Sequence, residues 1–262
     1  ITKHLGDGTV EVDTTATTDI DVDTGADTVI NSTEATAIVV SGATEGIEHD
    51  QKVTVTVTDS NDDEVIKTDI PVVNSNGEDG SGTWTTTFNV STLTDDAPST
   101  LTFVATVSDK AGNDANTDGS TTNTAVIKYD KTATTTIEVV TDEFDGTPAN
   151  VINADEDAAI DISGDTTGIE NGAVVTVTVT DTSSPTPKLI TNATATVTDN
   201  EWELLNLDVG VADPGLIDGT LTFSVSVSDL AGNEAVVSTG TDITYDKTAT
   251  TTIEVVTDEF DG

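Results

Sequence analysis

Apolar and polar residues alternate along several stretches of the chain. Valine and threonine take turns over residues 53–58, and residues 175–180 repeat the same arrangement. Residues 221–228 alternate Leu, Phe and Val with Thr and Ser. A period of two residues indicates a β-strand with one buried face and one solvated face. Because valine and threonine favour pleated strands over helices, the sequence predicts an all-β protein.

Turn residues divide the second half of the chain into seven predicted strands. Seven antiparallel strands with a single Trp among them are typical of a sandwich of two sheets. If the strands run up and down, the first begins and the last ends at opposite poles, so successive domains are expected to stack end to end as a rod. The strands are expected near residues 132–140, 158–164, 173–180, 188–198, 201–209, 220–228 and 235–245.

The sequence contains an internal repeat. The eighteen residues that start at Tyr129 recur without change at Tyr245, which places the copies 116 residues apart. Shorter segments match in the same order, among them TVTVTD at 54 and 176 and SD-x-AGN at 108 and 228. The repeat predicts four segments: the last strand of a preceding repeat in 1–12, complete repeats in 13–129 and 130–245, and the first strand of a following repeat in 246–262.

The charge of the chain is strongly one-sided. It has 49 acidic residues against 8 basic ones, all of them Lys, and a formal net charge of -41. Such a charge excludes nucleic acid as a partner. It also opposes compaction unless cations lie among the carboxylates, so the composition predicts bound metal or high salt. Disorder is the alternative for so acidic a chain, but the strand-length alternation argues against it.

Cysteine is absent, so neither a disulfide nor a thiolate metal site can stiffen the protein. Oxygen ligands remain for a metal. No stretch approaches the length of an apolar membrane span. The chain opens in mid-pattern without a charged and apolar leader, so we expect a fragment of a longer exported protein whose signal lies elsewhere.

Carboxylate and amide side chains are predicted to gather at one pole of each repeat, where the linker meets two loops. Ca²⁺ takes six to eight oxygen ligands in loose geometry and suits such a cluster better than Mg²⁺. Any single loop of this kind could instead hold Asp, Gly and Asn because tight turns favour them. Recurrence in both repeats and the acidic surplus favour Ca²⁺. The predicted ligands are Asp13, Glu48, Asp109 and Asn113 in the first repeat, Asp130, Glu170, Asp229 and Asn233 in the second, and Asp246 at the start of the next.

A second cation set is predicted in the loops that follow the first strand of each repeat. Residues 19–25 imitate an EF-hand loop, but the glycine comes one place late and Ile30 stands where the loop needs Glu. We interpret them as the solvated face of a strand. The candidate ligands are Asp23 and Asp27 with Asn31 in the first repeat, and Asp142, Glu143 and Asp145 with Asn153 in the second.

No catalytic motif recurs between the repeats. The two histidines, His4 and His49, have no counterpart in the second repeat. Two carboxylates can always be paired in so acidic a chain, so a glycosidase interpretation has no specificity. Motifs for nucleotides and zinc are absent. The sequence predicts that the protein is not an enzyme.

The SD-x-AGN turn, the strand that ends in Tyr-Asp-Lys-Thr and the early Val-Ile-Asn together resemble the bacterial Ig-like repeats of giant biofilm adhesins, the type I-secreted RTX adhesins of Gram-negative bacteria. The resemblance covers both repeats and both end segments. It implies tens of copies in series, Ca²⁺ at the junctions, export to the outer cell surface and ligand-binding domains elsewhere in the polypeptide. The glycine-rich nonapeptides of RTX proteins do not occur here.

The leading hypothesis is a Ca²⁺-rigidified extender that projects ligand-binding domains for adhesion and biofilm formation. Its expected partners are neighbouring repeats of the same monomeric polypeptide, with no nucleic acid and no membrane insertion. A lectin-like or cadherin-like recognition module is the alternative, although the shortage of aromatic residues suits a spacer better than a binding pocket. A eukaryotic cadherin-like ectodomain would make Asn31, Asn89 and Asn192 glycosylation sites, whereas bacterial repeats would leave them bare.

Overall fold

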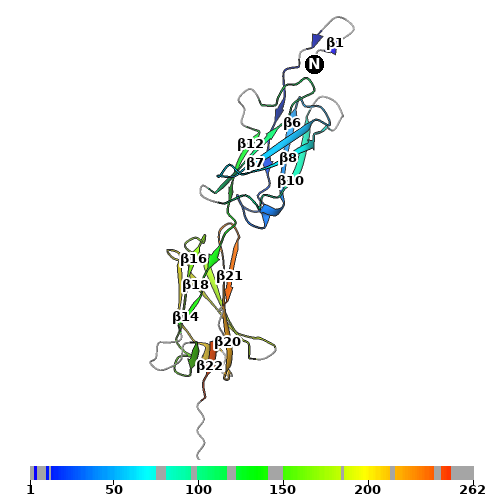
Figure 1. The fold of residues 1–262 in the computed structure, drawn as a ribbon. Helices are drawn as coiled ribbons and strands as arrows, with labels where there is room; N and C mark the ends of the chain where they lie inside the picture. Colours follow the sequence, from blue (N-terminus) through cyan, green and yellow to red (C-terminus); the bar gives the residue numbers. More distant parts are fainter. Residues whose placement is uncertain are drawn as a thin grey trace, which may run out of the picture. The chain divides into compact units, whose positions relative to one another are not determined.

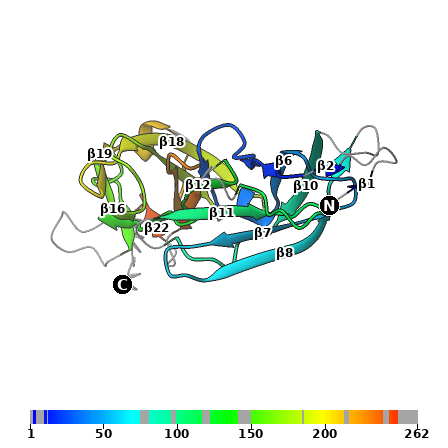
Figure 2. The same cartoon turned by 90° about the horizontal axis from the view of Figure 1, so that it is seen from above.

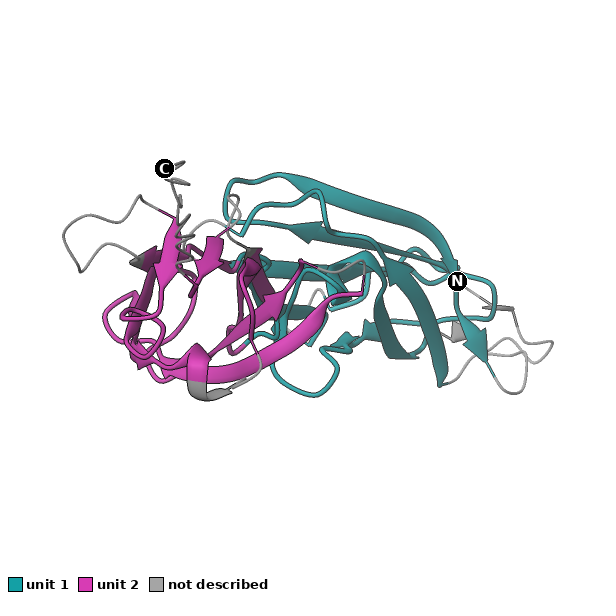
Figure 3. Ribbon diagram, turned by 90° about the horizontal axis from the view of Figure 1, so that it is seen from below, with its two compact units in different colours: residues 1–132, 231–233 teal, residues 133–230, 234–262 magenta. Residues whose placement is uncertain are grey.

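The chain forms two compact units, which Figure 3 colours separately. Unit 1 comprises residues 1–132 together with 231–233, and unit 2 comprises 133–230 and 234–262. The computed structural model describes residues 3–4, 10–11, 13–74, 81–95, 99–116, 122–140, 150–183, 186–212, 216–238 and 243–248.

Unit 1 contains two five-stranded sheets. One has the order β3-β6-β10-β9, with β4 also paired to β6, and the other has the order β5-β12-β11-β7-β8. Figure 2 shows β11 beside β7, its antiparallel partner. The strands are β3 (Thr17–Thr18), β4 (Asp21–Val22), β5 (Val29–Ile30), β6 (Ile38–Glu45), β7 (Lys52–Thr58), β8 (Glu64–Pro71), β9 (Val73–Asn74), β10 (Gly82–Phe88), β11 (Thr100–Thr106) and β12 (Thr124–Tyr129), and a 3-10 turn, η1, spans Glu34–Thr36.

Unit 2 repeats this arrangement with a four-stranded and a six-stranded sheet. The first pairs β13, β14 and β19 with β16, and the second has the order β15-β22-β20-β17-β18 with β21 on β20. Figure 1 labels several strands of each unit. The strands of unit 2 are β13 (Thr134–Thr135), β14 (Glu138–Val140), β15 (Val151–Asn153), β16 (Ile160–Thr167), β17 (Val174–Asp181), β18 (Lys188–Thr196), β19 (Glu201–Leu207), β20 (Gly219–Ser228), β21 (Glu234–Ser238) and β22 (Ile243–Asp246), with a short helix, α1, at Val209–Ala212.

Period-two alternation places one face of each strand in the core. Val53, Val55 and Val57 are fully buried in β7, while the threonines between them are partly exposed. Each unit buries one Trp, and its indole nitrogen donates to a threonine hydroxyl of the first strand. Trp84 donates to Thr18 at 2.9 Å and Trp202 to Thr135 at 3.1 Å. A buried indole needs such an acceptor, so Trp fixes the first strand to the sandwich.

The all-β fold class is confirmed, and the seven predicted strands of unit 2 all appear within a few residues. Three details differ from the prediction. The expected first strand, 132–140, is divided into β13 and β14. The expected last strand, 235–245, is divided into β21 and β22. The segment 151–153 forms an additional short strand, β15, which pairs with β22 in parallel because both run toward the same end of the sandwich.

The main strands of unit 2 pair in antiparallel fashion, but strands that follow one another in the chain do not always lie in the same sheet. The chain passes from β16 in one sheet to β17 and β18 in the other, and then returns with β19. Crossing between sheets lets each sheet bury its inner face against the other. The ends of β7 still lie at opposite ends of unit 1, roughly 20 Å apart for a strand of this length. Glu48 precedes β7 and Asp59 follows it directly, so these residues mark the two ends of the sandwich.

The first described residues form a small ladder. Strands β1 (Lys3–His4) and β2 (Val10–Glu11) pair with each other in antiparallel fashion. The domain limits that the repeat predicts stay predictions. Within the described residues, no helix is long and apolar enough to span a bilayer.

Candidate metal centre

The turn after β11 begins the cluster of predicted metal ligands in unit 1. The amide of Asp109 donates to the carbonyl of Asn113 at 3.0 Å, and the amide of Asn113 donates back to Asp109 Oδ1 at 2.8 Å. Gly112 closes the turn with a φ of +91°, which side chains rarely adopt. The SD-x-AGN motif therefore folds into a tight loop that fixes one carboxylate and one amide.

Two further predicted ligands lie against this turn. Glu48 Oε2 accepts a hydrogen bond from the amide of Lys110 at 2.8 Å. Asn113 Nδ2 donates to the main-chain oxygen of Asp13 at 3.1 Å and to Asp109 Oδ2 at 2.6 Å. The structure thus brings together in one place the four residues that the sequence predicts for the first repeat.

The two anionic side chains of this cluster are buried. Glu48 is 6% exposed and Asp109 is 4% exposed. Within the described part of the chain, neither carboxylate forms an ion pair. Burial by itself raises the pKa of the Asp109 carboxyl, but hydrogen bonds from Asn113 and from the amides of the turn outweigh burial and hold this pKa below its ordinary value. Asp109 therefore stays ionised.

The oxygen atoms of the cluster suit a hard cation, although carboxylates alone do not suffice. No group of three or more His, Cys, Asp or Glu among the described residues could hold a metal ion. Calcium also accepts main-chain and amide oxygens. The side-chain nitrogen of Asn113 points at two oxygen atoms. Rotating the side-chain amide by about 180° would place its oxygen there instead, without changing the shape of the side chain. Asp109, Glu48, the Asp13 carbonyl and the Asn113 amide then fit the chemistry of Ca²⁺.

Two of these contacts recur in the second repeat. Glu170 Oε2 accepts from the amide of Leu230 at 2.9 Å, as Glu48 does from Lys110. Asn233, which is grouped with unit 1, donates to the main-chain oxygen of Asp130 at 2.9 Å. Asp229 and Asn233 are buried. Asp246 ends β22 opposite Asn153, and its role as a ligand stays a prediction.

The second predicted set has another local role in unit 1. Asp23 Oδ1 accepts from the amide of Gly25 at 3.0 Å, and Asp27 Oδ1 accepts from the amide of Val29 at 2.8 Å. These carboxylates hold their own loop. Asp142, Glu143 and Asp145 lie outside the described residues.

The predicted asparagine ligands of that set cap a turn in both units. Asn31 Oδ1 accepts from the amides of Thr33 and Glu34, while Glu34 Oε2 accepts from the Asn31 amide. Asn153 and Glu156 make the same reciprocal pair. A capping interaction of this kind accounts for Asn at these positions without a metal.

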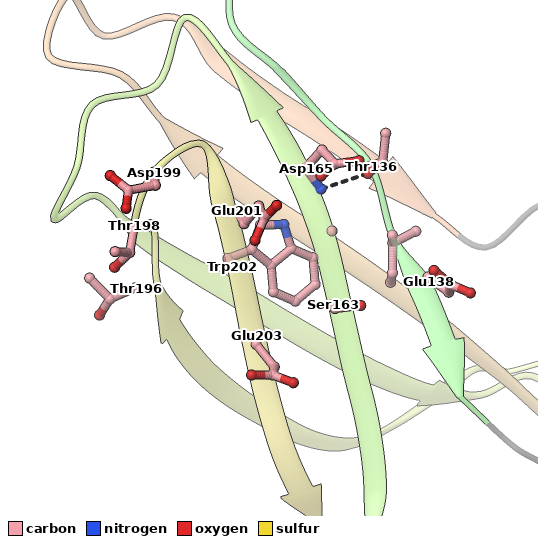
Figure 4. A pocket seen from close by; sticks show the side chains of 12 residues that line it. Thr136, Glu138, Ser163, Asp165, Thr196, Thr198, Asp199, Glu201, Trp202 and Glu203 are labelled. Atoms are coloured by element: carbon pink, nitrogen blue, oxygen red, sulfur yellow. Dashed lines mark hydrogen bonds between the residues drawn. The ribbon is translucent and has the colours of Figure 1, made fainter. Parts of the chain in front are cut away.

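A groove that the sequence does not reveal lies over the tryptophan of each unit. In unit 2 it has a volume of about 860 Å³, and the indole ring of Trp202 lies beside β16 at its floor (Figure 4). The first strand is interrupted here between β13 and β14. A Cβ on Gly164 would lie 2.1 Å from the Thr136 carbonyl oxygen and 2.7 Å from Trp202 Nε1, so only glycine fits. Gly42 and Trp84 repeat the contact in unit 1.

Comparison with known proteins places the chain near large adhesins. No protein-family model and no curated protein matches it. It is similar to a solved tetra-tandem repeat in the extending region of a large adhesion protein, with 27% identity over 88% of this chain and 49% of that chain and a TM-score of 0.35. This chain therefore spans about half the length of that structure.

A second solved structure comes from a 1.5-MDa bacterial ice-binding adhesin described for its retention at the host cell surface. It is 24% identical over 91% of this chain and 67% of that chain, with a TM-score of 0.39. Both proteins are large adhesins, the class that the sequence resemblance indicates. Because both TM-scores are below 0.5, neither likeness decides what this chain does.

A prediction that relies on residues shared by the two repeats misses a buried carboxylate in unit 2. Asp157 is 7% exposed, and its Oδ2 accepts from the hydroxyl of Tyr245 at 2.7 Å and from Lys247 Nζ at 3.2 Å. The corresponding residue of unit 1 is Ala35. A buried tyrosine needs a partner for its hydroxyl, and that requirement is the sequence signal that could have led to Asp157.

Proposed function

We propose that this chain is part of the extending stalk of a bacterial surface adhesin, in which calcium binds at one end of each domain. The stalk lies outside the cell, holds ligand-binding domains away from the surface, supports biofilm formation and performs no catalysis. The tandem repeat, the resemblance of its motifs to Ig-like adhesin repeats and the acidic composition support this role.

One observation carries the calcium part of the proposal. Glu48 and Asp109 are both buried and both accept hydrogen bonds from amides of the SD-x-AGN turn, in a protein with 49 acidic and 8 basic residues. Burying an ionised carboxylate costs free energy unless an opposite charge or hydrogen bonds compensate. The turn supplies hydrogen bonds, but its lysine, Lys110, is exposed and forms no ion pair with either carboxylate among the interactions described. A divalent cation would supply the opposite charge and would reduce the repulsion among the surrounding carboxylates.

Each ligand has a distinct task in this proposal. The Asp109 carboxylate provides charge and is held by the turn amides, while Glu48 provides the second charge from the loop before β7. The Asp13 carbonyl belongs to the segment that enters the unit, so its participation ties that segment to the turn. A ligand that binds the native state alone stabilises it by RT ln(1 + [L]/Kd), about 2.7 kcal/mol at a hundredfold excess over Kd.

Calorimetric titration of the 262-residue chain with CaCl₂, after dialysis against chelator, tests the proposal. We expect Ca²⁺ to bind the wild type and to raise its melting temperature. Asp109→Asn keeps an oxygen acceptor for the Asn113 amide but removes the charge, so it should lower the Ca²⁺ stoichiometry. Glu48→Gln should act in the same direction.

Asp155→Asn is the matched control, because this residue is exposed in a loop of unit 2 and lies outside the proposed set. It should leave the stoichiometry unchanged. Equal stoichiometry in wild type, Asp109→Asn and Glu48→Gln would show that the ligands are assigned wrongly. A wild type that binds no Ca²⁺ at millimolar concentration would remove calcium from the proposed function.

A further inference from the structure

The residues that leave each unit are held by a carboxylate at the end opposite to the candidate metal centre. In unit 1, Asp95 Oδ2 accepts from the main-chain amide of Lys131 at 3.0 Å and from the hydroxyl of Thr132 at 3.0 Å. Asp95 adjoins Thr94, whose amide donates to Asp59 at 2.8 Å. Because Asp59 follows β7 and Glu48 precedes it, the carboxylate and the metal centre lie at different ends of the sandwich.

Unit 2 makes the same contacts with Asp218. Its Oδ1 accepts from the main-chain amide of Lys247 at 2.7 Å, and its Oδ2 accepts from the hydroxyl of Thr248. The hydroxyl of Thr248 and the amide of Lys247 hold the pKa of Asp218 below its ordinary value. A carboxylate that accepts two such bonds is ionised over the neutral range.

The lysine of each exit segment folds back in the same way. The ammonium of Lys131 lies 5.7 Å from the centre of the Tyr129 ring, and that of Lys247 lies 5.9 Å from the Tyr245 ring. Both distances are within the range of a cation–π contact. The letters of Tyr-Asp-Lys-Thr therefore have separate roles: tyrosine anchors the strand in the core, lysine covers its ring, and the lysine amide and threonine hydroxyl meet the carboxylate.

The two carboxylates do not correspond in the sequence repeat. Asp95 precedes Leu101 by six residues, whereas Asp218 precedes Leu221 by three, although both leucines open the matching LTF segment. Asp95 and Asp218 thus reach the same two groups of the exit segment from different positions in the repeat. Carboxylates from two different repeat positions make the same contact, which indicates that the contact itself is needed to hold the exit segment and is not a mere consequence of the repeated sequence.

We propose that Asp95 and Asp218 act as clamps that fix the direction in which residues 131–132 and 247–248 leave their units, without any need for a divalent cation. Each clamp consists of protein donors and one carboxylate within a single unit. Asp130 and Asp246, the predicted calcium ligands that directly precede these segments, take no part in the clamp contacts, so the inference does not depend on calcium binding. It predicts that the exit segments keep their order when metal is removed.

Amide hydrogen exchange in the full 262-residue chain, followed by NMR in Ca²⁺ and in EGTA, tests the clamps. The amides of Lys131 and Lys247 should be protected in the wild type under both conditions. Asp218→Ala should speed exchange at Lys247 by about tenfold, the effect of one lost charge-assisted hydrogen bond, and leave Lys131 unchanged. Asp95→Ala should do the reverse, so each variant controls the other.

Two further variants separate the hydrogen bond from charge. Asp218→Asn keeps an acceptor oxygen and should retain part of the protection, whereas Asp155→Ala removes a charge from the loop after β15 and should change neither amide. If Asp218→Ala also speeds exchange at the core amide of Val177, the variant has disturbed the fold, and Thr248→Val is used as the test in its place. Exchange at Lys247 should then be a few-fold faster than in the wild type.

Two results would overturn the proposal. One is loss of protection at Lys131 and Lys247 in wild-type protein on addition of EGTA, because metal would then order the exit segments. The other is unchanged protection at Lys247 in Asp218→Ala with an intact core.

Discussion

The two units place a buried carboxylate in different positions, although they share one repeat. In unit 1 the Asp of TVTVTD, Asp59, is 6% exposed and accepts from the amides of Asn61, Asp63 and Thr94 and from the Thr94 hydroxyl. In unit 2 the corresponding Asp181 is partly exposed and accepts only from Ser183 among the hydrogen bonds described. The same aspartate of the repeat therefore holds a distant loop in unit 1, whereas in unit 2 its side chain contacts only its own turn among the hydrogen bonds described.

At the buried tyrosine of each unit the difference is reversed, because here the carboxylate contact is in unit 2. Tyr245 donates to the Asp157 carboxylate at 2.7 Å, whereas Tyr129 donates to the carbonyl oxygen of Val90 at 3.2 Å. Lys247 pairs with Asp157, but Lys131 donates to the carbonyl oxygen of Leu93 at 2.6 Å.

Each unit thus has one buried carboxylate that secures its exit end, contributed by a different element. In unit 1, Asp59 holds the loop that contains the acceptors of Tyr129. In unit 2, Asp157 holds Tyr245 directly. What the repeat preserves is the anchored tyrosine, while the carboxylate that supports it can move from one loop to another.

The largest expected effect comes from removing the carboxylate of unit 1. Asp59→Ala removes a buried acceptor from three main-chain amides and the Thr94 hydroxyl and should lower the free energy of unfolding of unit 1 by about 3 kcal/mol. Asp181→Ala in unit 2 removes contacts within one turn and should cost less than about 1 kcal/mol. Urea unfolding followed by Trp fluorescence measures both.

Each unit contains one Trp, so the readout can be made specific. Trp84 reports on unit 1 in a Trp202→Phe background, and Trp202 reports on unit 2 in a Trp84→Phe background. Asp59→Asn is the conservative control and should restore part of the loss. Equal losses for Asp59→Ala and Asp181→Ala would abolish the distinction between the units.

A smaller difference is expected at the tyrosine hydroxyls. Tyr245→Phe removes a hydrogen bond to a buried carboxylate and should destabilise unit 2 by about 2 kcal/mol, because bonds to charged groups contribute about 1.5–3 kcal/mol. Tyr129→Phe removes a bond to a neutral carbonyl and should cost unit 1 about 1 kcal/mol. The same single-Trp backgrounds supply the measurement. A larger loss for Tyr129→Phe would reverse the proposed order of the two anchors.

Much of the fold could be predicted from the sequence, because the alternation of residues determines which face of a strand is buried. The strand β17 and the buried Trp of each unit follow from local pattern and repeat. The pairing of β15 with β22 could not be predicted, because a three-residue strand carries no periodicity and its partner lies some ninety residues away. The crossing between sheets is likewise a long-range property.

The first candidate site was predicted because its residues recur at matching positions of the two repeats. The exit clamps were missed because Asp95 and Asp218 stand at unlike positions and bind groups about thirty residues away. Asp157 was missed because Ala35 replaces it in the other unit. Comparing the two repeats finds residues that both share, but it overlooks residues that play the same role from different positions in each unit.

The smallest and most specific prediction concerns the ionisation of the only two tyrosines. Burial first, and then the charges of Asp95 and Asp59, raise the pKa of Tyr129 from its ordinary 10.0 to about 12. Burial and the hydrogen bond to Asp157 raise the pKa of Tyr245, and Lys247 partly opposes this. A raised pKa means that the folded state favours the neutral phenol, so this stabilisation is complete below pH 10 and is lost as the pH rises through the folded pKa.

Phenolate absorbance should therefore stay low at pH 10 while Trp fluorescence reports folded units. Tyr245→Phe isolates Tyr129, and Asp157→Ala in a Tyr129→Phe background should move the titration of Tyr245 toward 10 by removing a negative neighbour. A half-ionised tyrosine at pH 10 in folded protein would contradict the burial of these anchors and, with it, the comparison between the two units.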